Sequence, residues 1–321
     1  MSGWVLWLLA CQCTDRQDTA SPEPEAWAMV GDTLGDAVLL GAWSTEQELL
    51  LVGGDLGSET PHGDLVRITA DSACVEEALT EHPLWWIHGL SDQDWWAVGE
   101  EGTVVHWDGD FTRLDIPTTA TLYGVFAASK DSVWAVGGQS DTERGEVWHW
   151  DGEWTLIKGD IPGQTFKVWQ DWIVGEGQAW RISGETLSPV PTSARLVTVR
   201  GRSSQDVYAV GGEGNPTVLR HQGQDWEELS VQKLNGPVSG VWTAPGETVW
   251  VAGNYGVMAQ LGDDGWEIPS FPLTSQHFHA VWQWEGAMWF VGGNLFERGE
   301  NHGTLACHGC ERELSALEAC E

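Results

Sequence analysis

The stretch that decides the fold is DSVWAVGGQS, Asp131–Ser140, because its central phrase recurs along the chain. Trp-Ala-Val-Gly occurs twice, and close variants complete a set of seven phrases that end at Gly53, Gly99, Gly137, Gly175, Gly211, Gly253 and Gly292. Successive closing glycines are 46, 38, 38, 36, 42 and 39 residues apart. Repeats of this length are typical of four-stranded propeller blades, so the spacing predicts seven blades.

The third copy can be divided into four strands. TLYGVFAAS (Thr121–Ser129) is rich in β-forming residues, and SVWAVGG (Ser132–Gly138) is almost wholly apolar, as a strand buried on both faces should be. GEVWHWDG (Gly145–Gly152) alternates and ends in Asp-Gly, a strong hairpin signal, and EWTLI (Glu153–Ile157) follows it. The pattern predicts an all-β, seven-bladed propeller with four antiparallel strands per blade, in which the repeat Trp packs between neighbouring sheets.

The two ends of the repeat region indicate how the ring closes. The seventh unit lacks a good fourth strand, whereas Trp27–Val30 resembles the outer strand of the third copy. We therefore expect the N-terminal strand to complete the seventh blade, with the propeller spanning residues 26–310. We expect residues 311–321 to form a short tail, in which the spacing of Leu314 and Leu317 favours a helix. A disulfide is expected to hold this tail.

The N-terminus predicts export. Residues 1–10 contain one short apolar run, too short to span a bilayer, and fit a lipoprotein-type signal peptide. Leu8–Cys11 resembles a lipobox, which makes Cys11 the expected lipidation site, and residues 11–25 are a polar, Pro-containing tether. The prediction is a cell-envelope lipoprotein, periplasmic or on the outer membrane or surface, that contacts membrane only through its lipid. A secreted soluble chain or a mis-assigned start is the alternative.

The cysteines fit an oxidising compartment. With Cys11 lipidated and Cys13 left as a free thiol in the tether, the disulfide candidates are Cys74, Cys307, Cys310 and Cys320. Three pairings are open, and Cys310 with Cys320 would pin the tail. The competing interpretation is a metal site, whose weak candidate ligands are His302, Cys307, His308 and Cys310.

The charge excludes some partners. Fifteen Lys and Arg stand against 48 Asp and Glu, a formal net charge of −33. Such a chain repels phosphate backbones, so we expect no nucleic-acid partner. Solubility is one reading of the acidity, and attraction of cations or a basic partner is the other. The acidic loops Asp108–Asp110 and Gly262–Gly265 leave calcium open, but Asp-Gly is first of all a turn, and no cofactor is expected.

The repeat also resembles a known family. DSVWAVGGQS…GEVWHWDGEW and DQDWWAVGEEGTVVHWDGDF are similar to the repeats of photosystem II assembly-factor-like propellers and their bacterial exported relatives, within the wider Asp-box class that includes sialidases. The resemblance implies a seven-bladed propeller. Two features depart from it: His106 and His149 precede Trp-Asp-Gly where a full Asp-box begins with Ser or Thr, and the acidity of this chain contradicts the basic partner-binding surface of the photosynthetic members.

No catalytic residue is assigned. A sialidase-like site needs a Tyr nucleophile and several Arg from different blades, but Tyr208 occupies a repeat Trp position and Arg195, Arg200 and Arg202 fall in one blade. His277 and His279 share one side of an expected inner strand and would face the channel or a blade interface. Most Trp residues follow the repeat and are expected in the core. The Trp residues partly out of register, candidates for exposure, are Trp85, Trp95 and Trp284.

These observations favour a monomeric, non-enzymatic, envelope-tethered propeller that binds a protein or glycan ligand on one face. The alternative is a hydrolase or lyase with its active site at the mouth of the propeller channel. A cluster of His, Arg and carboxylates that converges from several blades at one mouth would indicate the enzyme.

Overall fold

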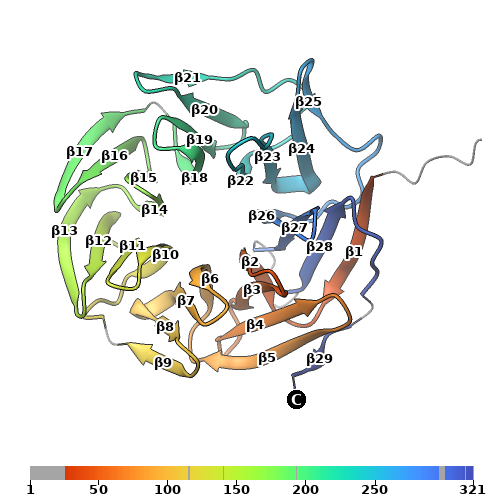
Figure 1. The fold of residues 1–321 in the computed structure, drawn as a ribbon, viewed down its shortest axis with the longest axis horizontal. Helices are drawn as coiled ribbons and strands as arrows, with labels where there is room; N and C mark the ends of the chain where they lie inside the picture. The colour runs from red at the N-terminus through yellow and green to blue at the C-terminus, as the bar shows by residue number, and fades with distance from the viewer. Residues whose placement is uncertain are drawn as a thin grey trace, which may run out of the picture.

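The computed structural model describes residues 26–114, 116–139, 141–192, 194–295, 301–314 and 316–320. These residues form seven sheets arranged as a ring around a central axis, so the predicted seven-bladed propeller is confirmed (Figure 1). The predicted signal peptide and tether, with Cys11 and Cys13, lie outside the described residues. Among those described, no helix has the length and apolar character needed to cross a bilayer.

Each blade has four antiparallel strands, which follow one another in space from the innermost to the outermost. Blades 1 to 3 are β2 (Val38–Ser44), β3 (Glu48–Asp55), β4 (His62–Thr69) and β5 (Ala73–Thr80); β6 (Leu84–Ser91), β7 (Asp94–Gly99), β8 (Val104–Trp107) and β9 (Phe111–Leu114); and β10 (Thr121–Ser129), β11 (Ser132–Gln139), β12 (Arg144–Trp150) and β13 (Trp154–Pro162). Blades 4 and 5 are β14 (Thr165–Trp169), β15 (Trp172–Gly175), β16 (Gln178–Ser183) and β17 (Thr186–Pro191); and β18 (Leu196–Ser203), β19 (Asp206–Gly211), β20 (Thr217–His221) and β21 (Trp226–Glu228). Blades 6 and 7 are β22 (Val238–Trp242), β23 (Trp250–Gly253), β24 (Val257–Gly262) and β25 (Gly265–Glu267); and β26 (Phe278–Trp284), β27 (Ala287–Gly293), β28 (Gly303–His308) and β1 (Trp27–Leu34). Two 3₁₀ turns, η1 (Glu100–Gly102) and η2 (Asn254–Gly256), and strand β29 (Glu318–Ala319) complete the described elements.

The N-terminal strand closes the ring, as predicted. β1 pairs antiparallel with β28, with Trp27 opposite His308 and Leu34 opposite Gly303. The seventh sheet therefore joins the beginning of the described chain to its last blade, and Figure 1 shows β1 beside β28. Closure of a ring by one strand from the opposite end of the chain removes the free edge that an open array would leave.

The glycine that ends each repeat phrase is required by close packing of two strands. A Cβ at any of the seven closing glycines would lie 1.9–2.3 Å from a backbone carbonyl oxygen at the start of the innermost strand, for example 2.2 Å from the Thr121 oxygen at Gly137. No side chain fits such a space, so glycine is needed for steric reasons. By contrast, Gly102 and Gly256 adopt φ of 66° and 72° in the turns that follow.

The same contact coincides with a register shift in every innermost strand. In blade 4 Thr165 pairs with Gly175 but the next pair is Lys167 with Val174, and the six other blades show the shift at the corresponding place. A β-bulge of this kind puts two residues of one strand opposite one residue of its partner. Consecutive side chains next to the bulge, such as Phe166 and Lys167, consequently line the channel together.

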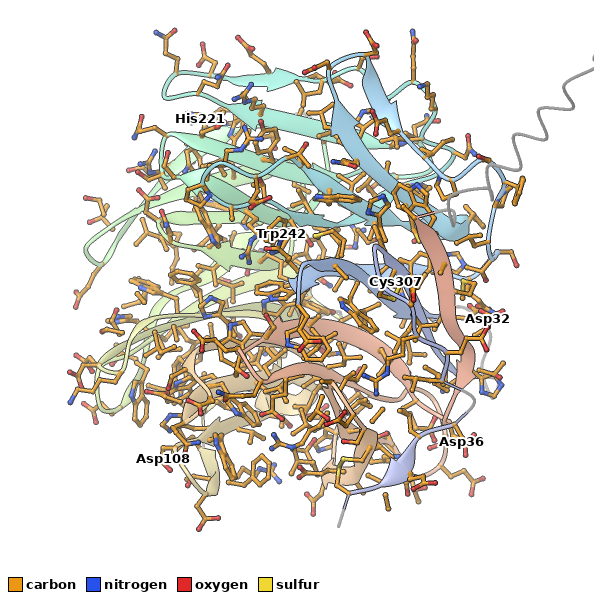
Figure 2. The ribbon with its side chains drawn as sticks, turned by 45° about the vertical axis from the view of Figure 1, so that its right-hand side comes forward. Asp32, Asp36, Asp108, His221, Trp242 and Cys307 are labelled. Atoms are coloured by element: carbon orange, nitrogen blue, oxygen red, sulfur yellow. A yellow bond between two sulfur atoms is a disulfide. The ribbon has the colours of Figure 1, made fainter. Side chains whose placement is uncertain are left out.

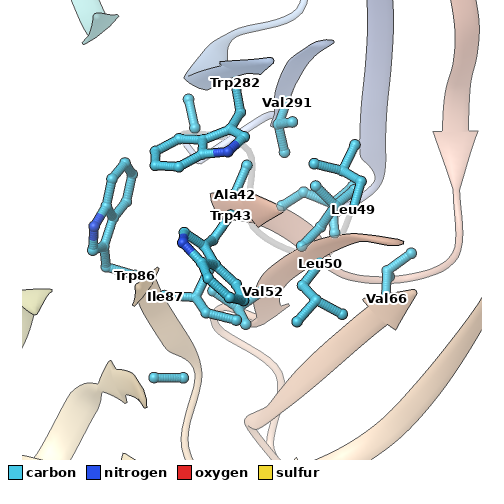
Figure 3. Close-up of a cluster of buried hydrophobic side chains, with 14 of the residues drawn as sticks. Ala42, Trp43, Leu49, Leu50, Val52, Val66, Trp86, Ile87, Trp282 and Val291 are labelled. Carbon is cyan, nitrogen blue, oxygen red and sulfur yellow. The ribbon is translucent and has the colours of Figure 1, made fainter. Parts of the chain in front are cut away.

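The repeat aromatic residues fill the spaces between blades. Each is at most 8% exposed, as predicted, and the set comprises Trp96, Trp134, Trp172, Tyr208, Trp250 and Trp289. In the first blade Leu50 takes this position and is fully buried. Figure 3 shows the transition around blade 1, where the aliphatic Leu49, Leu50 and Val52 give way toward the channel to Trp43, Trp86 and Trp282.

The C-terminal tail is extended, and the predicted helix is wrong. The Leu314 amide donates to the Val30 carbonyl of β1 at 2.7 Å, and β29 pairs in parallel with β5 of blade 1. The tail thus runs from the outer strand of blade 7 to that of blade 1, as Figure 1 shows. An extended chain rises about 3.3 Å per residue, whereas a helix rises about 1.5 Å. The extended form therefore reaches further across the blade edge, and it leaves backbone groups free to pair with both β1 and β5.

Candidate functional site

The site that the fold creates is a cup in one mouth of the central channel. The cavity measures about 310 Å³. Gln164 and Arg195, from connections between blades, and Asn254 and Leu295, from turns that follow second strands, form its rim. All seven blades contribute to its wall, so the cup belongs to the ring as a whole.

The wall consists of the residue at the β-bulge of each innermost strand. Each of them lines the cup, and in blade order they are Leu40, Trp85, Tyr123, Phe166, Val197, Ser239 and His279. Trp85 packs edge-on against Tyr123, with ring centroids 5.0 Å apart, and Tyr123 packs in the same way against Phe166 at 5.4 Å. One side of the cup is therefore a continuous aromatic surface built by blades 2, 3 and 4.

Lys167 of β14 supplies the floor. Its Nζ donates a hydrogen bond to the backbone carbonyl of Tyr123 and lies 4.3 Å from the centroid of the Trp86 ring. Burial lowers the pKa of the Lys167 ammonium to about 7. Lysine is rarely buried without a counter-charge, because loss of hydration disfavours the charged form.

A lower ring of side chains narrows the channel below Lys167. These residues lie opposite the repeat aromatic position in each sheet and are Trp43, His88, Phe126, Trp169, Arg200, Trp242 and Trp282. The cavity lined by five of them, His88, Phe126, Trp169, Arg200 and Trp282, measures only about 10 Å³. The channel is therefore much narrower here than in the cup. Figure 2 shows Trp242 in the interior, whereas Asp108 projects from the margin.

Arg200 is the second cation of the channel. Its guanidinium carbon lies 4.1 Å from the Trp282 ring centroid, and its Nε donates to the Thr243 carbonyl at 3.0 Å. Burial lowers the pKa of Arg200 to about 9, and the guanidinium remains charged at neutral pH.

Two histidines enter the channel in the neutral form. Burial and then the charge of Arg200 lower the pKa of His88 to about 3, and the Ala127 amide donates to its Nδ1 at 3.2 Å. Burial and the charges of His277 and Lys167 lower the pKa of His279 to about 4, and its Nε2 donates to the Gly293 carbonyl at 2.9 Å. Neither imidazole can donate as an imidazolium near neutral pH, and bases this weak are poor proton acceptors.

Carboxylates do not line the cup among the described residues. Two acidic side chains, Glu100 and Glu176, pair with lining residues near the rim. Trp85 Nε1 donates to Glu100 Oε1 at 3.3 Å, and Arg195 Nε lies 3.5 Å from Glu176 Oε1. Cations and imidazoles thus converge from several blades, whereas the carboxylates that an acid–base site would add are not among the lining groups.

The sequence-predicted metal set is not assembled. Cys307 and Cys310 form a disulfide with each other, which removes both thiolates. His302 Nδ1 donates to the Gly35 carbonyl at 3.1 Å, and His308 packs against Trp27 with centroids 4.7 Å apart. The described residues hold no cluster of three or more potential metal ligands, at the acidic loops Asp108–Asp110 and Gly262–Gly265 or elsewhere.

The second disulfide joins Cys74 of β5 to Cys320, with the two Cα atoms 5.0 Å apart. All four disulfide candidates are therefore bonded, but the suggested pairing of Cys310 with Cys320 is wrong. The tail carries Cys320 beside β5, where its amide donates to the Val75 carbonyl at 3.0 Å, so Cys74 is the nearer partner. The bond fastens blade 1 to the end of the chain that leaves blade 7.

Other sequence candidates divide between core and site. Of the three Trp residues named as candidates for exposure, Trp95 and Trp284 are buried, and the half-buried Trp85 lines the cup. His279 faces the channel, and His277 packs 5.0 Å from Tyr255 of blade 6. His106, which stands where an Asp-box has Ser or Thr, stacks on Trp96 at 3.9 Å.

Lys167 was not among the residues predicted from the sequence. The available signal was its occurrence in an expected inner strand of a chain that has only four lysines. The arginine cluster noted in blade 5 is dispersed: Arg195 reaches the rim, Arg200 the channel, and Arg202 pairs with Asp206 at 3.2 Å.

Comparison with known proteins places the fold and nothing narrower. No family model matches the sequence, and no curated protein matches it. A structure of YCF48 bound to a D1 peptide aligns with TM-score 0.65 and 14% identity over 90% of this chain and 98% of its own. The WD40 propeller domain of Doa1 aligns with TM-score 0.65, 8% identity and coverages of 88% and 97%. YCF48 from Cyanidioschyzon merolae aligns with TM-score 0.61, 13% identity and coverages of 88% and 98%. These likenesses show a propeller fold.

Proposed function

We propose that this chain is a non-catalytic binding propeller whose ligand enters the cup at the channel mouth. The observation that carries the proposal is the cup itself, an aromatic-walled cavity of about 310 Å³ that is lined by Lys167 and Arg195 and, among the described residues, by no carboxylate. Concave, mostly apolar cavities with a few convergent polar groups are the usual form of ligand sites. A structurally similar propeller, YCF48, has been seen with a peptide bound, which supports a protein segment as the ligand.

Lys167 at the floor of the cup favours a protein segment over a glycan. An uncharged sugar could stack on Trp85, Tyr123 and Phe166, but it would leave Lys167 without a counter-charge. A protein segment can bring both an apolar side chain and a charged group. The enzymatic alternative, hydrolysis or elimination at the same mouth, finds among the described lining groups neither a carboxylate nor an imidazole that could be protonated at neutral pH.

The experiment that tests this function is site-specific photocrosslinking in native envelope. A photoreactive amino acid at Val197, on the cup wall, should capture a partner. The matched position is Glu46, exposed at the opposite face, and it should not. Capture from Glu46 alone would contradict the proposal, as would turnover of a substrate that Lys167→Met abolishes without an effect on folding.

We further propose that the chain acts as a monomer, exported and anchored by lipid on Cys11. The lipobox-like Leu8–Cys11 supports the anchor, and the two disulfides support an oxidising compartment. A fatty-acid analogue should label the full chain, and the label should be lost in Cys11→Ser. Cys13→Ser, two residues away in the same segment, is the matched control and should keep the label.

A further inference from the structure

Lys167 differs from every other lysine in the chain. Lys130, Lys158 and Lys233 are exposed, whereas Lys167 lies on the floor of the cup. Burial of an ammonium group costs free energy unless hydrogen bonds and an opposite charge compensate for it. An anion bound in the cup would supply that opposite charge and favour the ammonium form.

The contacts within the chain satisfy Lys167 only in part. An ammonium has three donors. The Tyr123 carbonyl accepts from one of them, and the Trp86 ring face attracts the charge without neutralising it. Among the described residues no carboxylate forms an ion pair with Lys167 or with Arg200.

Other cations of the same intermediate exposure have carboxylate partners. Arg67 lies 2.9 Å from Glu48 and 2.7 Å from Glu76, and Arg220 lies 2.8 Å from Asp206. A chain with 48 acidic residues thus places carboxylates on half-buried cations at the blade interfaces and keeps them away from the cations of the channel.

We propose that the cup binds the carboxylate of an aromatic or other apolar acid, with the ammonium of Lys167 as its direct partner and the aromatic wall around its apolar part. This inference rests on the proposed function and specifies the chemistry of its ligand. A carboxylate supplies the missing negative charge, and charge-assisted hydrogen bonds of this type are about twice as strong as neutral ones. A phosphate, with more charge and more acceptors, would need more donors than this floor presents.

The surroundings of Lys167 agree with an anionic ligand. His279 from β26 and Arg195 line the cup together with Lys167. Lys167 also lines the narrow cavity below the cup, with Arg200 from β18 and His88 from β6. Both imidazoles are neutral, since burial keeps their pKa values near 3 and 4. Among the described residues, the lining groups that are ionised near neutral pH are therefore all cations. One of them, Arg195, is paired with Glu176 at the rim.

Carboxylate binding should be linked to protonation of Lys167. The free ammonium titrates with a pKa of about 7, and a bound carboxylate favours its charged form. Affinity should be greatest between the pKa of the acid and about pH 7, and should fall about tenfold per pH unit above that. At pH 7 binding should take up about half a proton, which calorimetry in buffers of different ionisation enthalpy measures.

The probes for the test are three molecules that share one ring. These are 4-fluorophenylacetate, its neutral amide and 4-fluorophenethylamine, followed by ¹⁹F NMR with the full chain, so that the many Trp residues do not interfere. The carboxylate should bind about tenfold or more tightly than the amide, and the amine should not bind. Lys167→Met should remove the preference, whereas Lys158→Met, an exposed lysine, should retain it.

The outcomes separate this inference from the proposed function. Equal binding of the acid and the amide, or an undiminished preference in Lys167→Met, would overturn the carboxylate site. Competition by inorganic phosphate at equal concentration would replace it with a phosphate site. If Val197 captures a partner but no acid binds, the binding function stands and the ligand chemistry is wrong. If Lys167→Met lowers the melting temperature, the lysine is structural and the inference fails; a higher melting temperature with lost binding supports it.

Discussion

The blade interfaces and the central channel use the sevenfold repeat in opposite ways. At the interfaces the same residue recurs: the closing glycine is present in all seven blades, and an aromatic residue precedes it by three positions in six of them. On the cup wall the seven equivalent positions hold seven different residue types, from Leu40 to His279. The ring geometry imposes the first set seven times. Nothing in that geometry imposes the second, which is where a ligand can be recognised.

The cations show the same division. Arg181 and Arg220 project from the third strands of their blades, stack on Trp172 and Tyr208 and pair with carboxylates at 2.6 and 2.8 Å. Lys167 and Arg200 also contact aromatic rings but have no carboxylate partner in the part of the chain that the structure describes. Cations stack on aromatic rings in both regions. The two regions differ in that only the cations at the blade interfaces are paired with carboxylates. A neutralised cation can stabilise the fold, whereas a buried cation without a counter-charge costs stability that an anionic ligand restores.

The largest effect should come from the repeated glycine. Gly211→Ala places a Cβ 2.0 Å from the Arg195 carbonyl oxygen, so the first two strands of blade 5 must separate. We expect a loss of more than about 4 kcal/mol in the free energy of unfolding, measured by urea denaturation. Gly159→Ala is the control, because its Cβ meets nothing nearer than 3.4 Å. Equal stability of the two variants would show that the close approach does not hold the blade.

A paired cation should come next. Asp206 accepts from Arg220 Nε at 2.8 Å and from Arg202 at 3.2 Å, so Asp206→Asn leaves two guanidinium groups without their carboxylate. Because the group is only partly buried, we expect a loss of about 2 kcal/mol at neutral pH. Burial alone would raise the pKa of Asp206, but the hydrogen bonds and charges of the two arginines outweigh it and lower that pKa.

The pH dependence follows from that sign. A carboxyl whose pKa is lowered by folding contributes stability above its unfolded pKa of about 3.9, and the contribution disappears as pH falls through the folded value. The difference between the wild type and Asp206→Asn should therefore shrink in acid. A difference that is constant from pH 7 to pH 3 would mean that packing, and not the ion pairs, accounts for the loss.

The repeating framework could be predicted from the sequence and the channel could not, for a physical reason. Closing glycines and repeat aromatic residues recur because close strand packing and the space between blades require them. The spacing of residues such as Gly137 and Trp134 along the chain therefore predicts the blades. Lys167 lies beside a bulge at which two successive side chains face the channel, and strict alternation fails there. The predicted helix in the tail is wrong, although Leu314 and Leu317 have helical spacing. The open edge of β5 and the backbone of β1 offer hydrogen-bond partners that only an extended chain can use.

The channel cation should give an effect of opposite sign. Lys167→Met removes a buried charge and keeps a flexible apolar side chain against Trp86, so it should raise the free energy of unfolding by about 1–2 kcal/mol at pH 7. The lowered pKa of about 7 also sets a pH window. The folded state resists protonation more than the unfolded chain does, whose lysine pKa is about 10.4, so the wild type gains stability between pH 7 and pH 10. The advantage of Lys167→Met should vanish over that range, and an advantage that grows with pH would contradict the buried charge.

The smallest effect should come from a cation that is paired but exposed. Arg113 and Glu81 lie 3.4 Å apart, with side chains 50% and 82% exposed. Water and salt screen such a pair, and ordering two long side chains costs entropy, so Glu81→Gln should change the free energy of unfolding by less than about 0.5 kcal/mol. The change in the free energy of unfolding in Glu81→Gln separates the effect of burial from the effect of pairing. Asp206 and Glu81 both pair with arginine but differ in burial, and Lys167 and Arg113 are both cations but differ in pairing. If Glu81→Gln costs as much as Asp206→Asn, pairing alone would account for the interface cations, and the channel would no longer be exceptional for what it lacks. If the cost is negligible at low salt as well as at high salt, burial decides what each cation contributes. The two channel cations, partly buried and without a counter-charge among the described residues, are then the ones left to a ligand.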